Sequence, residues 1–128
     1  MLDTGVLVAL ANRADPDHEA CVEALEHSTA RLVTVEGVLV EACFLLRRSS
    51  APARPIELAL ALDAQLHPHS PGGLRRAVEF LRRYQSKSID LVDALLCVAA
   101  EELRISKIFT LDRRDFSVYR LRGSRALE

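Results

Sequence analysis

The chain alternates short runs of apolar residues with longer stretches in which apolar positions recur every three to four residues. The short runs predict strands at 1–3, 31–34 and 107–111, and the periodic stretches predict amphipathic helices between them. On the helix expected at 38–46, one face collects five apolar residues: Val38, Leu39, Ala42, Leu45 and Leu46. Strands that alternate with helices in this way are typical of an α/β fold with a mostly parallel sheet.

Residues that favour helix ends and turns define the remaining elements. Asp15 is placed to cap a second helix, with Pro16 in its first turn. Prolines, serines and glycines between the middle helices predict a loop at 49–55 and a turn at 70–73, with a short strand at 67–69 before the turn. The further helices expected from spacing and composition are 5–12, 15–26, 56–66, 74–84 and 90–103.

Composition adds limits on size, partners and location. With 128 residues, 49% apolar and 27% charged, we expect one domain over residues 1–128 with a single core. The formal net charge of -1 excludes a protein that coats nucleic acid by bulk positive charge. The three cysteines lack C-x-x-C spacing and no apolar window approaches the ~20 residues of a membrane helix. We therefore expect reduced thiols, a cytoplasmic location and no membrane partner.

Four acidic residues carry the candidate chemistry. Asp3 and Asp112 each follow an expected strand, and the carboxyl ends of parallel strands are where open α/β sheets bind ligands. Glu41 and Asp93 lie on otherwise apolar helices, where a carboxylate near the buried face is unfavourable unless it has a partner. Carboxylates gathered at one edge would bind Mg²⁺ or Mn²⁺, and such ions activate water for phosphodiester cleavage. Crowding should raise the pKa of at least one of these carboxyls without metal.

Helix capping offers an alternative explanation for each acid taken alone. Asp90 is placed to cap a helix with Asp93 in its first turn, which stabilises a helix without any further function. Asp112 could likewise cap a short helix that begins at Arg113, and Asp3 could cap the first helix. Only the presence of all these acids in one chain favours a functional site.

Four segments together resemble the motifs of the PIN-domain family, in particular its VapC-type toxins. They occur in the family's order and spacing at 2–10, 38–42, 90–96 and 110–116, and so span nearly the whole chain. The resemblance implies a PIN fold, with a central parallel sheet flanked by helices, and Mg²⁺- or Mn²⁺-dependent cleavage of RNA. It also implies a toxin–antitoxin setting, in which a small antitoxin protein blocks the site, and a homodimer.

The resemblance also assigns residues. It implies that the four metal-binding, catalytic acids are Asp3, Glu41, Asp93 and Asp112. Supporting positions are Thr4 and Thr110, which match hydroxyl residues of the family, together with Asp90 and with Asp115, an alternative fourth ligand to Asp112. Gly5 departs from the pattern, because many members carry Asn or Ser there, and this puts the orientation of the first acid in doubt.

RNA binding and the alternatives to it depend on other features. Arg113 and Arg114 are the cations nearest in sequence to a proposed ligand, and we expect them to contact phosphates, although exposed arginines more often form salt bridges on helix surfaces. A PIN-like domain that serves as a non-catalytic binding or scaffolding module remains an alternative, as does cleavage of DNA. Haloacid-dehalogenase phosphatases and response-regulator receivers fit poorly, since the phosphatase needs an Asp where Gly5 stands.

Overall fold

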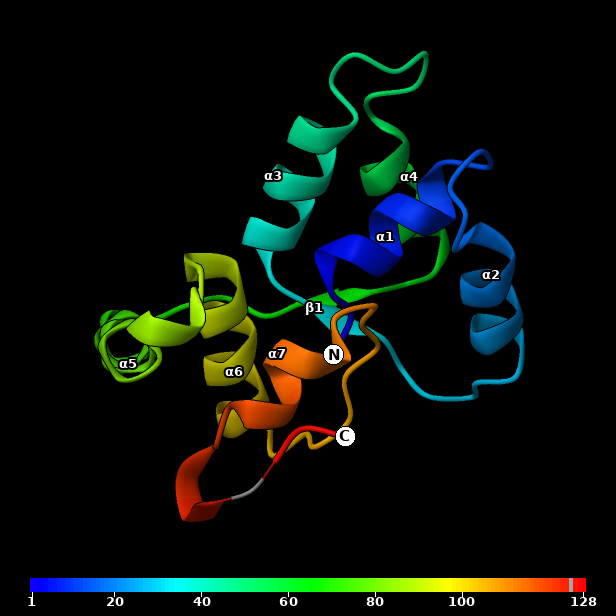
Figure 1. The fold of residues 1–128 in the computed structure, drawn as a ribbon. Coiled ribbons are helices and arrows are strands. Elements are labelled where there is room, and N and C mark those ends of the chain that lie inside the picture. The colour runs from blue at the N-terminus through cyan, green and yellow to red at the C-terminus, as the bar shows by residue number, and fades with distance from the viewer. Residues whose placement is uncertain (125) are drawn as a thin grey trace.

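Short extended segments lie side by side at the centre of the computed structural model, which describes residues 1–124 and 126–128 (Figure 1). β1 (Val33–Thr34) and β2 (Gln65–Leu66) pair in parallel. On the other side of β1, Leu2 donates its backbone N–H to the Val33 carbonyl at 2.8 Å and forms a parallel bridge with Phe109. The order β2, β1, Leu2, Phe109 agrees with the expected mostly parallel sheet.

Seven α-helices of the described residues surround these segments (Figure 1). They are α1 (Thr4–Ala11), α2 (His18–Glu26), α3 (Glu36–Leu45), α4 (Arg54–Ala61), α5 (Pro71–Arg83), α6 (Leu91–Leu103) and α7 (Arg113–Val118), with 3-10 turns η1 (Gln85–Lys87) and η2 (Arg122–Ser124). Helix α1 packs against α2, α3 and α4, and α5 packs along α6. In the described part of the chain, no helix is both long and apolar enough to cross a membrane.

The middle of the chain differs most from the sequence expectation. The helix expected at 56–66 stops at Ala61, because the chain turns through a left-handed conformation at Asp63 (φ 50°). The strand expected at 67–69 is wrong in position: β2 begins two residues earlier and ends before residue 67. Helix-favouring residues continue past Ala61, so local composition gives no sign of this turn. The helix ends and the strand begins here because residues 65–66 pair with β1, which is distant in sequence.

Two expected helix starts are wrong. Residues 70–73 are not a turn: Ser70 caps α5 by accepting the backbone N–H of Gly73 at 3.0 Å, and Pro71 occupies the first turn. A Cβ on Gly73 would lie 3.1 Å from a carboxylate oxygen of Glu102, so the glycine permits α5 to approach α6 closely. At the second helix, Pro16 precedes α2 instead of entering it, and Asp15 accepts the backbone N–H of Asp17.

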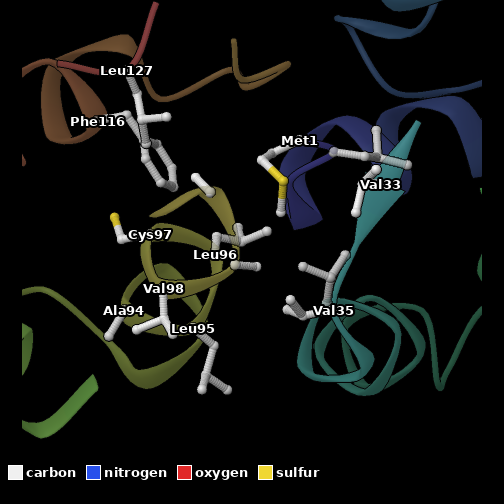
Figure 2. Close-up of a cluster of buried hydrophobic side chains, with 14 of the residues drawn as sticks. Met1, Val33, Val35, Ala94, Leu95, Leu96, Cys97, Val98, Phe116 and Leu127 are labelled. Atoms are coloured by element: carbon white, nitrogen blue, oxygen red, sulfur yellow. The ribbon is translucent and has the colours of Figure 1, made fainter. Parts of the chain in front are cut away.

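Helix α6 passes through the centre of the hydrophobic core. Its buried residues run without interruption from Ala94 to Ala100, so nearly every face of the helix contacts other elements. Figure 2 shows Leu96 and its neighbours on α6 with Met1, Val33 and Val35 in one buried cluster. A helix buried on all sides holds its first turn in a fixed place, and that turn carries Asp93.

The segment after α7 is held against the end of α5 and against α6 by side chains. Arg120 donates its backbone N–H to the Tyr84 hydroxyl at 2.8 Å, and Arg122 donates its backbone N–H to Glu101 at 2.7 Å. Tyr119, which directly follows α7 in the chain, is fully buried. This segment contains no periodic apolar pattern, so its sequence alone does not assign it to a helix or a strand.

Candidate active site

Six carboxylates from separate parts of the chain line one cavity of about 580 Å³: Asp3, Glu41, Asp90, Asp93, Asp112 and Asp115. Thr4, Gly5 and Ser88 also line it, and no lysine or arginine does so among the described residues. The cavity lies where α1, α6 and α7 begin and where α3 passes, so the fold brings together all four acids that the sequence singled out. Both candidates for the fourth position, Asp112 and Asp115, face this cavity.

Asp3 is held from two sides by threonines. It is 8% exposed and accepts the backbone N–H of Thr4 at 2.7 Å through Oδ1, as the N-cap of α1. Its other oxygen, Oδ2, accepts the hydroxyl of Thr110 at 2.7 Å. The Thr110 hydroxyl in turn accepts the backbone N–H of Asp112 at 2.9 Å, so one side chain links two of the proposed acids.

Three further acids, Glu41, Asp90 and Asp112, each have an oxygen held by the protein. Glu41 accepts the Thr4 hydroxyl at 2.7 Å through Oε2. Asp90 accepts the backbone N–H of Asp93 at 2.9 Å, and Asp112 accepts that of Asp115 at 3.2 Å, so both are N-caps as the alternative explanation expected. Within the described residues, the second oxygens of Glu41 and Asp90 have no protein partner, whereas the Asp112 carboxylate also shares a hydrogen bond with the Asp115 side chain. Capping and lining the cavity are therefore compatible roles of the same side chains.

The helix starts reduce the repulsion between these acids. The N-termini of α1, α6 and α7 each present backbone N–H groups to a carboxylate of the cavity. The partial positive charge at a helix N-terminus stabilises nearby anions. The backbone thus offsets part of the unfavourable energy of crowding six acids.

Protonation of the site follows from burial and crowding. Burial, followed by the negative charges of Asp90 and Asp3, raises the pKa of Asp93 to about 7. Burial also raises the pKa of Asp3, although hydrogen bonds from Thr110 and Thr4 favour its ionised form. The pKa of Asp115 is raised by burial and by neighbouring Asp112. The direction of these pKa shifts agrees with the expectation for at least one carboxyl, but burial contributes more than the expected crowding.

Oxygen ligands without a competing cation fit a hard divalent ion such as Mg²⁺ or Mn²⁺. No three acidic, histidine or cysteine side chains converge enough to share one ion among the residues that the structure describes. Magnesium ions in proteins commonly keep several waters and use only one or two carboxylates directly. The donor set fits an ion held partly through water.

The structure also places the two candidate RNA-binding arginines, Gly5 and one unexpected tyrosine. Arg113 lines a neighbouring, mostly apolar cavity, and neither Arg113 nor Arg114 is part of the acidic cavity's lining. A Cβ on Gly5 would make only ordinary contact with Leu111, at 3.8 Å, so packing does not require a glycine there. One polar contact, from the Tyr119 hydroxyl to Asp93, was not expected, because no local pattern places a C-terminal tyrosine beside α6.

The stability of the metal-free protein should depend on Asp93 in a defined direction. Its pKa is raised from 3.8 to about 7 on folding, so the folded state binds the proton more tightly than the unfolded state. This contribution is fully present below about pH 4 and is lost as pH rises through about 7. We expect the loss to be about 1–2 kcal/mol, less than the full shift implies because the carboxyl is partly solvent-screened.

Urea unfolding of the EDTA-treated protein at pH 5 and pH 8 measures this effect. Asp93→Asn should remove it, making the variant more stable than wild type at pH 8 and nearly equal at low pH. An equal pH dependence in the two proteins would contradict the assignment of the shift to Asp93.

Comparison with known proteins identifies the fold. The PIN domain family model matches residues 1–121. Ribonuclease VapC26 of Mycobacterium tuberculosis is 30% identical over 125 residues, which cover 94% of this chain and 91% of that protein. The crystal structure of Mycobacterium tuberculosis VapC20, described as a Sarcin-Ricin loop cleaving toxin, superposes with a TM-score of 0.79 at 20% identity, over 89% of this chain and 90% of that one. The structural likeness confirms the α/β PIN fold, and the chain belongs to the PIN domain family.

Proposed function

We propose that the protein is a metal-dependent endoribonuclease that hydrolyses RNA phosphodiester bonds. The observation that carries this proposal is the single acidic cavity, to which Asp3, Glu41, Asp93 and Asp112 contribute from four separate segments. Membership of the PIN family and the likeness to a protein named a ribonuclease support RNA as the substrate class.

Asp3, Glu41 and Asp93 are proposed to hold Mg²⁺ or Mn²⁺, directly or through water, and Asp112 completes the set with Asp115 as its alternative. A bound divalent ion would activate water and stabilise charge on the phosphate. Thr4 and Thr110 hold Glu41 and Asp3 through their hydroxyls.

Substrate contact is assigned to α7. Arg113 and Arg114 follow Asp112 directly and are exposed, so they are placed to bind phosphates of an RNA strand whose scissile bond reaches the cavity. The cavity itself contains no cation in the described residues and would repel RNA until divalent ions are bound. Arginine therefore supplies affinity outside the cavity, while the acids supply the chemistry inside it.

The biological setting follows from the relatives. One relative is named Ribonuclease VapC26 and the structural neighbour VapC20 is described as a toxin, and on that basis we propose that this chain is the toxin of a toxin–antitoxin pair. It would act on cytoplasmic RNA as a homodimer, and a small antitoxin protein would block the site. A gene for a small protein next to the gene of this chain would support the pairing. Copurification of that small protein with this chain would test it.

The direct test is cleavage of an end-labelled RNA pool by purified protein with Mn²⁺, with Mg²⁺ and with EDTA. We expect cleavage with either ion, none with EDTA, and recovery when excess Mn²⁺ is added back. A folded wild-type protein that binds no divalent ion and cuts no RNA in a varied pool would overturn the proposal in favour of a non-catalytic binding module. Cleavage rates on DNA of the same sequences measure whether the protein prefers RNA to DNA.

Thr110→Val tests whether the hydroxyl that holds Asp3 in place is needed for cleavage. The hydroxyl of Thr110 fixes Asp3 and is fixed by Asp112, so its loss should lower the cleavage rate about tenfold, as loss of groups that orient metal ligands generally does. Thr34→Val is the matched control, because the buried Thr34 hydroxyl donates to the Leu2 carbonyl outside the cavity. That control should lower stability without changing the rate per folded molecule. Equal rates for the two variants would exclude a role for Thr110.

A further inference from the structure

The hydroxyl of Tyr119 reaches Asp93 from beneath the acidic cavity. Tyr119 is fully buried, and its Oη donates a hydrogen bond to Asp93 Oδ2 at 3.4 Å. The two residues are 26 positions apart, and Tyr119 itself is not part of the cavity lining. The tyrosine thus contacts the acid from the protein side.

Packing of its ring, and docking of the chain that follows it, determine where this hydroxyl lies. The Tyr119 ring packs against the rings of Tyr84, at 5.1 Å between centroids, and Phe116, at 5.5 Å. Two turns further along α6 from Asp93, Glu101 accepts the backbone N–H of Arg122 at 2.7 Å. The ring therefore has little freedom to move away from Asp93.

Asp93 is held at its backbone and at its carboxylate, on the wall of the cavity. Its backbone N–H is bound by Asp90, and its Oδ2 by Tyr119. The Asp93 carboxylate also accepts a hydrogen bond from the backbone of Asp90, which favours its ionised form, and the residue lines the cavity. A hydrogen bond to one oxygen restricts rotation of the carboxyl group, so the second oxygen keeps a constant direction.

We propose that Tyr119 is a positioning residue that holds the Asp93 carboxylate in the orientation needed to bind a divalent ion. The proposal rests on the proposed nuclease function, because it gives Asp93 a metal to hold. The 3.4 Å distance is longer than the usual 2.7–2.8 Å for such bonds, and hydrogen bonds of active sites are often long before ligands bind and tighten afterwards.

Two tyrosine-to-phenylalanine variants separate positioning from packing. Tyr119→Phe keeps the ring and removes the hydroxyl that contacts Asp93. Tyr84→Phe removes a hydroxyl from the same aromatic cluster that contacts the backbone of Arg120 instead. For both variants and wild type, we would measure Mn²⁺ affinity by calorimetry, kcat and KM for a cleaved RNA, and the thermal midpoint, together with a metal-free crystal structure of Tyr119→Phe.

We expect Tyr119→Phe to weaken Mn²⁺ binding and to lower kcat, each about tenfold, with an unchanged KM. Its metal-free crystal structure should show Asp93 in more than one rotamer. Tyr84→Phe should change the thermal midpoint at least as much, yet leave Mn²⁺ affinity and kcat within about twofold of wild type.

Wild-type Mn²⁺ affinity and kcat in Tyr119→Phe would overturn the inference and leave the proposed function intact. Equal losses in the two variants, or loss of the fold in Tyr119→Phe, would also overturn it by assigning the hydroxyl a purely structural role. If wild type itself neither binds Mn²⁺ nor cuts RNA, the proposed function fails, and the inference fails with it.

Discussion

Asp93→Asn should reduce RNA cleavage on the order of 10³-fold while the protein keeps its fold. Asparagine has the shape of aspartate but lacks its charge, so it removes a proposed metal ligand without removing packing contacts. Metal ions contribute several kcal/mol of transition-state stabilisation, and each factor of ten in rate corresponds to about 1.4 kcal/mol. Initial cleavage rates at saturating Mn²⁺ and circular dichroism spectra of both proteins measure the two parts of this prediction.

Asp63→Asn supplies the matched control for this experiment. Asp63 lies after α4, outside the acidic cavity, and its left-handed backbone is one that asparagine adopts readily. The control makes the same chemical change and should cleave RNA at the wild-type rate. Near wild-type cleavage by Asp93→Asn would remove Asp93 from the catalytic set and with it the metal site as proposed.

Glu101→Ala should lower the free energy of unfolding by about 3 kcal/mol, which corresponds to a fall of about 10 °C in the thermal midpoint. The Glu101 side chain is 5% exposed and accepts two hydrogen bonds from Arg76, at 2.8 and 3.0 Å, besides the backbone N–H of Arg122. Its removal leaves the partly buried Arg76 without its main partner. Chemical denaturation of wild type and variant measures the difference.

Glu79→Ala tests the same arginine from its exposed side. Glu79 also pairs with Arg76, but its side chain is 64% exposed, and exposed ion pairs contribute about 0–1 kcal/mol. The two variants should therefore differ by roughly 2 kcal/mol although each deletes one carboxylate partner of Arg76. Equal effects would indicate that burial of Glu101 contributes little to the stability of the α5–α6 pair.

The acids of the cavity were predictable because each carries a local signal. Asp3 and Asp112 stand at strand ends, and Asp93 interrupts an apolar helix, so the pattern of hydrophobic and polar positions is enough to mark them. Local signals of this kind also place α3 and α6 within one or two residues. From the sequence, helix capping and a functional site are competing explanations for these acids. In the structure, Asp90 and Asp112 each cap a helix and also line the cavity.

The features that were missed depend on contacts distant in sequence. β2 forms because residues 65–66 meet β1, and nothing near Asp63 signals the end of the preceding helix. The glycines after Ser70 suggest a turn, yet both lie inside α5, where Gly73 leaves room for the Glu102 side chain of α6. Tyr119 has no local signal at all, since its hydroxyl meets Asp93 only after the chain returns to α6.

The capping role of the cavity acids limits which substitutions the protein tolerates during evolution. Asp3, Asp90 and Asp112 each bind a backbone N–H at the start of a helix, so a change to alanine would weaken that helix by about 1 kcal/mol in addition to any effect on chemistry. Asparagine caps a helix about as well as aspartate does. Lineages that lose activity but keep the fold should therefore accumulate asparagine or serine at these positions before other residues.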